Sequence, residues 1–274
     1  MKAGNTSVAV TATAVWTPGG VWVNVRPNAG PAGGALATWP EAPPLSVVHP
    51  KARRPHREAT VLVQLAHVLL MARAAAHPTA PPPIPAQTDL LLGTATGSAA
   101  ADGEFLRDLR ERGSGFGSPS TFVYTLSTAA PAEVAIALGL RGSLATLTAG
   151  GVSGLSAVVR AARRVGRGES RACITGGVEL AGPLHRQPSE EPLREVAALF
   201  LLEASTFPSA WPRLSDAELG FEPVANVGDA AGGDCATDSL LALATACVER
   251  REPHLVEVSA HSREGHWARL RVQW

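Results

Sequence analysis

The chain has 274 residues, a formal net charge of zero and a 45% share of apolar residues. Such a length can bury one large core or the two halves of a duplicated fold, and the apolar share excludes an intrinsically disordered chain. Balanced charge provides no overall basic field, so neither nucleic acid nor an anionic membrane is expected as a partner.

Cysteine usage and the N-terminal residues bear on the compartment. Cys173, Cys235 and Cys247 are the only cysteines, and their odd number and irregular spacing predict buried thiols in a reducing compartment, without a disulfide framework or a zinc site. Residues 1–7 lack the apolar core of a signal peptide. No run approaches the roughly 18 uninterrupted apolar residues of a membrane span. A cytoplasmic location is therefore expected.

The N-terminal residues predict a β-hairpin followed by a loop and a helix. Small and apolar residues alternate over 8–15, a Pro-Gly-Gly turn follows at 18–20, and apolar residues resume at 21–23. Proline, glycine and alanine dominate residues 27–45, which indicates a loop. Apolar residues at helical spacing then predict a helix from about 57 to 76.

The middle of the chain alternates strands with helices. A short apolar run at 89–94 predicts a buried strand, an amphipathic helix is expected over 102–111, and another helix carries 132–138. The next expected elements are a strand, a turn, a helix and a strand, at 144–148, 150–151, 152–166 and 171–175. This alternation of strands and helices indicates an α/β architecture.

The C-terminal part predicts fewer elements. A strand is expected over 196–203, and proline residues around 207–212 then interrupt the pattern. A strand near 221–227 and a helix from about 234 to 250 follow, before paired strands at 254–260 and 266–273. No short-period repeat is visible.

The most informative motif lies at 146–156, Thr-Leu-Thr-Ala-Gly-Gly-Val-Ser-Gly-Leu-Ser. It is preceded at 136–143 by Ile-Ala-Leu-Gly-Leu-Arg-Gly-Ser and followed at 174–179 by Ile-Thr-Gly-Gly-Val-Glu. Together these segments resemble the strand, nucleophile turn, helix and next strand of β-ketoacyl synthases. The family spacing to Gly168 places the reactive cysteine of that family at Gly151.

The resemblance implies a thiolase-like α/β fold, with layers in the order α/β/α/β/α, formed by a single domain over 1–274. Residues 1–203 would form the N-terminal half and residues 204–274 a shortened C-terminal half. Far fewer residues separate Glu203 from Gly228 than a full synthase carries in this region.

The residues that such a synthase needs for chemistry are missing. The family uses a cysteine thiolate to accept the acyl group, and Gly151 has no side chain to offer. Of the two family histidines, one has no matching motif here and the other aligns with Asp229, whose negative charge would repel a developing enolate. We therefore expect no catalytic residues, no cofactor, no metal and no independent Claisen condensation.

The resemblance implies a role like that of a chain length factor, a ketosynthase-like pseudoenzyme. It would form a heterodimer with a full-length β-ketoacyl synthase and shape its acyl tunnel in polyene-type biosynthesis, including aryl polyene pathways. The expected dimer strand is Leu144, Ala145, Thr146, Leu147 and Thr148, and the expected tunnel-lining residues are Phe116, Phe122 and Tyr124.

Two basic clusters allow a second partner, an acidic acyl carrier protein. Arg160, Arg163, Arg164 and Arg167 share one helix face, which can either dock such a protein or simply be solvated. The segment before the first helix has the same two interpretations. From the two clusters, the docking candidates are Arg53, Arg54, Arg57, Arg160 and Arg164.

Two other functions stay open. An acyl-thioester hydrolase could use Ser153 or Asp229, although Gly151-Val152-Ser153-Gly154-Leu155 lacks the last glycine of the Gly-x-Ser-x-Gly nucleophile elbow. The chain could also be a homodimeric module that binds acyl groups or carrier proteins. His261 and His266 lack a third ligand at metal spacing and indicate surface or hydrogen-bonded histidines.

Overall fold

A computed structural model describes most of the chain. The described residues are 8–24, 37–38, 44, 46, 55–76, 82–113, 115, 117–181, 195–204, 212–221, 238–248, 255–262 and 265–273. Their helices are α2 (Arg57–Ala76), η1 (Pro85–Gln87), α3 (Ala99–Arg112), α4 (Pro119–Val123), α5 (Ala129–Leu138), α6 (Ser153–Gly166) and α7 (Asp238–Val248). The strands are β1 (Val8–Thr17), β2 (Gly20–Asn24), β3 (Ala37–Thr38), β4 (Thr88–Gly93), β5 (Leu144–Leu147), β6 (Ala172–Glu179), β7 (Val196–Ala204), β8 (Arg213–Phe221), β9 (Leu255–His261) and β10 (His266–Gln273).

All of these strands join one mixed ten-stranded sheet, in the order β5-β4-β6-β7-β1-β8-β10-β9, with β2 attached to β1 and β3 attached to β2. Strand β4 pairs in parallel with β5 and β6, whereas β7 runs antiparallel to both β6 and β1. Strand β1 pairs with β8 through only two of its residues, Val8 and Ala9. The sheet therefore consists of two broader parts joined through a narrow connection.

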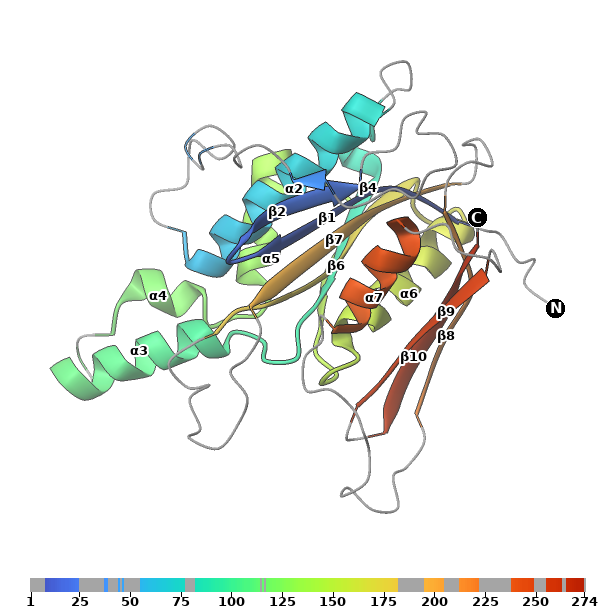
Figure 1. Cartoon of the computed structure of the whole chain (residues 1–274). Helices are drawn as coiled ribbons and strands as arrows, with labels where there is room; N and C mark the ends of the chain where they lie inside the picture. Colours follow the sequence, from blue (N-terminus) through green and yellow to red (C-terminus); the bar gives the residue numbers. More distant parts are fainter. Residues whose placement is uncertain are drawn as a thin grey trace.

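Helices cover both faces of the first part. Figure 1 shows α2 and α5 on one side of β4, β6, β7 and β1, with α6 and α7 on the other side, between these strands and β8–β10. Among the described residues this arrangement provides four layers in the order α/β/α/β, so the last helical layer of the predicted order α/β/α/β/α is not seen in this part of the chain. No helix among the described residues covers the outer face of β8, β10 and β9.

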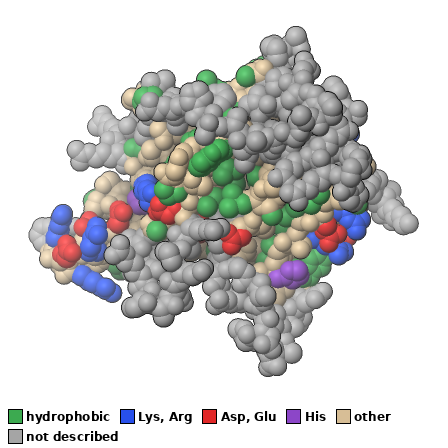
Figure 2. Space-filling model, viewed as in Figure 1, with side chains coloured by type: hydrophobic (Ala, Val, Ile, Leu, Met, Phe, Trp, Pro, Cys, Tyr) green, Lys and Arg blue, Asp and Glu red, His purple; other side chains and the backbone are tan. Residues whose placement is uncertain are grey.

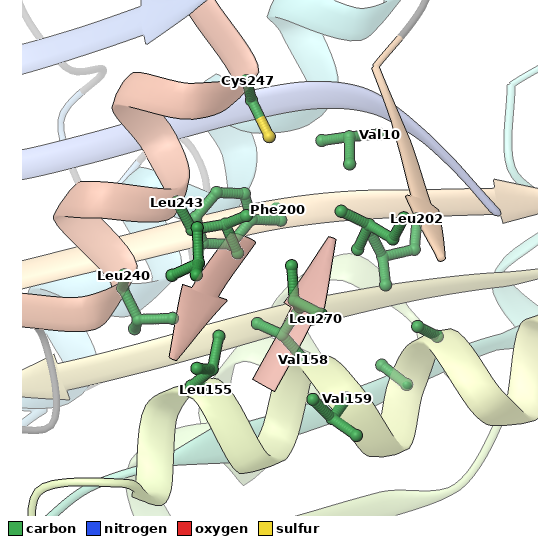
Figure 3. Packing of buried hydrophobic residues seen from close by; sticks show 14 of the residues in the cluster. Val10, Leu155, Val158, Val159, Phe200, Leu202, Leu240, Leu243, Cys247 and Leu270 are labelled. Atoms are coloured by element: carbon green, nitrogen blue, oxygen red, sulfur yellow. The ribbon is translucent and has the colours of Figure 1, made fainter. Parts of the chain in front are cut away.

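Strand β7 separates two hydrophobic cores. Alternate side chains of a strand point to opposite faces. Phe200 and Leu202 therefore pack with α6, α7 and the inner face of β10, whereas Leu199 and Leu201 pack with α2 and α5. Figure 3 shows the first core, in which Leu155 and Val158 of α6 lie opposite Leu240 and Leu243 of α7.

The outer face of the C-terminal strands is charged. Arg269 pairs with Glu218, and Arg271 pairs with both Asp216 and Glu257, at 3.1 and 3.2 Å. Figure 2 shows acidic and basic side chains gathered at this end of the molecule. Such paired charges are compatible with a sheet face that water covers in place of a helix.

Most predicted elements are confirmed, with some corrections. Residues 37–38, expected within the loop at 27–45, form β3. The strand expected near 221–227 is instead β8 (Arg213–Phe221), and residues 222–227 lie outside the described residues. The strand expected over 171–175 continues to Glu179 because Gly176 lets the backbone approach β7, where a Cβ would overlap the Ala198 carbonyl. Helix α4 was not predicted, although Ser118 caps it and proline occupies its first position.

Helix α2 is long and apolar enough to meet a length-and-hydropathy test for a membrane span. In this fold it is a core helix, because Leu62, Leu65 and Leu69 are fully buried against the sheet and α5. More than half of the tested window is buried within the protein, at 56%.

Candidate functional site

The turn between β5 and α6 is tightly constructed. Gly150 has a φ of 58°, a left-handed conformation that favours glycine, and Gly151 is buried immediately before the helix. Gly93, at the end of β4, packs directly on this turn, since an added Cβ there would overlap the Ser153 backbone. The turn expected at 150–151 is confirmed, and no side chain is available at Gly151 to attack a substrate.

The Ser153 hydroxyl is part of the turn. It donates a hydrogen bond to the Gly150 carbonyl and accepts one from the Ala149 amide, both at 2.7 Å. The side chain is fully buried, and both partners are backbone groups rather than a base that could take its proton. Ser153 therefore stabilises the turn, and this geometry does not favour the hydrolase alternative.

Neither described cysteine replaces the absent thiolate. Burial raises the pKa of the thiols of Cys173 and Cys247 well above the ordinary range. In Figure 3 the Cys247 side chain lies within the apolar core, close to Val10. Both thiols stay protonated at neutral pH and are inert packing groups.

Two carboxyl groups lie beside the loop that follows β4. Glu179 accepts hydrogen bonds from the Ala95 amide and from the Thr96 hydroxyl, the latter at 2.7 Å. Burial raises its pKa despite these bonds. Burial and the nearby Glu179 charge raise the pKa of Glu58, in the first turn of α2, to about 8. Glu179 fixes the loop, and Glu58 is the group here that titrates near neutral pH.

The predicted tunnel residues occupy different environments. Phe122 is 57% exposed, with its ring 5.4 Å from that of Phe105. The Tyr124 hydroxyl donates to Glu133 at 3.0 Å, and burial together with this contact raises the pKa of Tyr124 to about 12. Phe116 lies outside the described residues. Their role as tunnel-lining residues stays a prediction.

The arginines proposed for carrier docking do not form one surface. Arg57 begins α2 and binds both carboxylate oxygens of Glu195, at 2.5 and 2.7 Å. Arg160 and Arg164 belong to α6, on the opposite face of the sheet. Arg53 and Arg54, like Asp229, lie outside the described residues.

Arg164 is largely neutralised. Its guanidinium donates to Asp89 at 2.8 Å, to Ser143 at 3.1 Å and to Glu169 at 3.2 Å. The hydrogen bond to Asp89 is the main reason why its pKa is raised. Asp89 also accepts from the Ser143 amide at 2.8 Å, so the network ties α6 to the beginnings of β4 and β5.

Strand β5 forms one edge of the sheet and pairs only with β4 among the described strands. It contains Leu144, Ala145, Thr146 and Leu147, while Thr148 directly follows its end, so the predicted strand is one residue too long. The Ser143 and Leu147 carbonyls accept from β4 and its following residue. By strand alternation, the backbone groups of Leu144 and Thr146 point toward the open edge.

Exposed apolar side chains flank this edge. Leu126, Ile136 and Leu144 are 63%, 64% and 37% exposed. Leu126 lies beside β5, because the Thr146 hydroxyl donates to the neighbouring Ser127 carbonyl. A helix over 132–138 was predicted from the sequence, without an indication of which of its faces is uncovered. Phe122 and Val123, both more than half exposed, belong to the α4 segment just before Leu126.

On its other side, β5 borders a groove along α6 of about 570 Å³. Ala145 and Leu147 supply apolar lining, and Leu219 contributes from β8. The four arginines of the α6 stripe also line the groove: Arg160, Arg163, Arg164 and Arg167. Among the described residues, no group of three or more His, Cys, Asp or Glu side chains could hold a metal ion.

Comparisons with known proteins identify the family. The profile described as Beta-ketoacyl synthase, N-terminal domain, matches residues 50–187, half of the chain. Comparison with curated proteins finds no match.

Solved structures share the fold at low identity. The ishigamide ketosynthase/chain length factor is 15% identical, with a TM-score of 0.71 over 97% of this chain and 99% of that chain. A ketosynthase in complex with its chain length factor from Xenorhabdus doucetiae is 12% identical, with a TM-score of 0.61 over 98% and 99%. A β-ketoacyl synthase from Burkholderia phymatum STM815 is 13% identical, with a TM-score of 0.65 over the same shares. The fold is the predicted thiolase-like fold, and the chain belongs to the β-ketoacyl synthase family.

Proposed function

We propose that this chain is a non-condensing subunit, similar to a chain length factor, that pairs through the β5 edge with a complete β-ketoacyl synthase. Its C-terminal half is shortened, and its role is to support the partner's acyl tunnel in polyketide biosynthesis of the polyene type. The observation that carries this proposal is the open edge of β5, flanked by exposed apolar side chains and followed by a turn without a nucleophile.

The β5 edge supports the pairing step. An open strand edge presents unsatisfied N–H and C=O groups that a second strand can satisfy. Leu126, Ile136 and Leu144 would add apolar contact on the α5 side. Antiparallel addition of a partner strand would thus combine main-chain hydrogen bonds with burial of this apolar surface.

The geometry of the turn supports the absence of condensation. A ketosynthase must hold the acyl group on a thiolate, and Gly151 provides none. Ser153 is committed to backbone hydrogen bonds, and the two described thiols are buried and protonated. A subunit with such a turn contributes surface and shape, while its partner supplies the chemistry.

Two of the structural neighbours are compatible with this assignment. The ishigamide structure is named as a ketosynthase and chain length factor, and the Xenorhabdus structure as a ketosynthase in complex with its chain length factor. A third neighbour, 14% identical with a TM-score of 0.66, is a type II polyketide synthase acyl-carrier protein in complex with its ketosynthase. We therefore extend the proposal to a carrier protein that visits the assembled pair.

Co-expression tests the pairing. The chain is produced with the ketosynthase encoded beside it, and the purified material is measured by native mass spectrometry and size-exclusion chromatography. We expect a stable one-to-one complex that forms acyl product when carrier protein and malonyl units are supplied. A monodisperse monomer that ignores that ketosynthase would overturn the proposal.

Restoring the nucleophile tests the loss of chemistry. Gly151→Cys should give no condensation product in the isolated chain, because a single thiol lacks the histidines that polarise the thioester and drive decarboxylation. The measurement is a radiolabelled malonyl extension assay with Gly150→Cys as the position control. Product above the level of that control would show that the remaining machinery is intact.

A further inference from the structure

The α6 side of the β5 edge is cationic, in contrast to its apolar α5 side. Four arginines line the groove. Arg164 pairs with Asp89 and Glu169, and Arg167 pairs with Glu169. Among the described residues, no acidic side chain forms an ion pair with Arg160 or Arg163. Arg163 instead donates to the Ala217 carbonyl at 2.9 Å, which fixes its position without neutralising it.

The position of this charge follows from the register of β5. Ala145 lies opposite Leu91, and both side chains point toward α6, whereas the Thr146 hydroxyl bonds on the α5 side. The arginine stripe therefore lies directly above the inner border of the edge that we propose as the pairing surface. Any strand that adds to β5 brings its own covering helix toward this stripe.

Symmetry decides which partner fits. Two copies of this chain that joined through β5 would be antiparallel and related by a two-fold axis normal to the sheet, which leaves both α6 helices on the same face. Strand β4, beneath α6, would lie one and a half strand spacings from that axis, about 7 Å. The two copies of β4 would be about 14 Å apart across the axis, and the arginine side chains, which line the groove beside β5, would extend into this gap, where like charges would repel.

We infer that the α6 groove selects a partner with acidic side chains on the matching helix and disfavours a second copy of this chain. The inference rests on the proposed function and names the chemistry of the partner: a ketosynthase whose helix next to the paired strand carries Asp or Glu toward Arg160 and Arg163. Apolar contact on the α5 side provides affinity, and charge on the α6 side provides discrimination.

The test reverses the charge of the stripe. Arg160→Glu is combined with Arg167→Glu, because both side chains are exposed and neither contacts Asp89; Arg167 has only a 3.7 Å contact with Glu169. The control is Arg171→Glu with Arg112→Glu, two exposed arginines that do not line the groove and give the same change in net charge. Circular dichroism and thermal unfolding establish that each variant is folded. Affinity for the co-purified ketosynthase is measured between 50 and about 500 mM salt, a range over which surface charge is progressively screened.

We expect the wild-type heterodimer to weaken with salt and the groove variant to bind about tenfold more weakly at low salt, with a flatter salt dependence. The groove variant should also form a homodimer at concentrations where the wild type is monomeric, because its new glutamates meet the remaining arginines of the second copy. The control should match the wild type in both measurements.

The outcomes separate the two claims. A wild-type heterodimer whose affinity is unchanged in the groove variant would overturn the inference and leave the proposed function standing. A wild-type chain that forms a stable homodimer through β5 would also overturn the inference. Absence of any wild-type complex with the ketosynthase would overturn the proposed function, and with it the inference.

Discussion

The two end strands of the main path of the described sheet, β5 and β9, are constructed differently. Strand β5 begins with Leu144 and strand β9 with Leu255, and these leucines are 37% and 46% exposed. Strand β5 contains no charged residue. Strand β9 carries Glu257, which pairs with Arg271 of β10, and Asp216 of β8 extends the ion pairs. Charged side chains are a common protection against unwanted pairing at an edge.

The contrast shows that exposure of an apolar residue does not by itself identify an interface. Both strands expose a leucine, but β5 lies beside the segment that carries the exposed Leu126 and Ile136, and it contains no charged residue. The β9 edge belongs to a face that ion pairs make compatible with water. A strand without charged residues of its own, bordered on one face by exposed apolar side chains, is the one expected to take a partner strand.

The largest expected effect comes from placing one charge at each edge. Leu144→Asp should weaken the complex with the ketosynthase by about 100-fold, or about 2.7 kcal/mol, because a carboxylate would be desolvated without a partner in the interface. Leu255→Asp, the matched variant at β9, should leave affinity within about twofold. Isothermal titration calorimetry measures both. Equal losses at the two edges would remove the distinction between them.

A smaller effect concerns pH and separates folding from pairing. The pKa of Glu58 in the folded protein is about 8, above its ordinary value of 4.5. Between these two pH values the folded protein keeps the carboxyl group protonated, whereas the unfolded protein releases the proton. The resulting stabilisation is complete below pH 4.5 and is lost as the pH rises through 8.

At pH 9 the free energy of unfolding of Glu58→Gln should therefore exceed that of the wild type by about 1 kcal/mol. The difference should be smaller at pH 6. Chemical denaturation at the two pH values checks this, with Glu111→Gln on exposed α3 as the charge-matched control. Parallel pH profiles for Glu58→Gln and wild type would show that Glu58 is solvated. Binding at the two edges is best compared at one fixed pH, because the contribution of Glu58 to stability falls between pH 4.5 and 8.

The smallest effect removes the protection of β9. Glu257→Thr makes the strand as uncharged as β5, and we expect weak self-association, a few-fold above wild type, with no change in ketosynthase affinity. Analytical ultracentrifugation at rising concentration measures the association, and Glu218→Thr on β8, which β10 separates from β9, is the control for loss of charge away from the edge. A variant that stays as monomeric as the wild type would mean that Glu257 does not protect the edge.

The central elements of the fold could be predicted from the sequence, because hydrophobic periodicity and turn residues indicate the same elements there. Helix α2 and the strand, turn and helix around Gly151 have clear periodicity and turn glycines, and their resemblance to one family is specific. The β8 strand was misplaced because proline residues around 207–212 suggested a longer interruption. Its real position depends on pairing with β10, a contact between distant parts of the chain.

The site was less predictable than the fold. The loss of the nucleophile could be read from Gly151 alone, but the locked hydroxyl of Ser153 depends on turn geometry. Helical spacing grouped the α6 arginines correctly, yet it could not show that Arg164 is paired with Asp89, 75 residues away. The uncovered face of α5 was also hidden, because apolar residues such as Ile136 are normally buried.

Strand β7 has a consequence for how the molecule unfolds. One strand forms the wall of both cores, with Leu199 and Leu201 on one side and Phe200 and Leu202 on the other. Loss of packing around α7 would leave Phe200 without its neighbours and release the strand that also supports α2. We therefore expect the two cores to unfold as one cooperative unit, because both depend on β7.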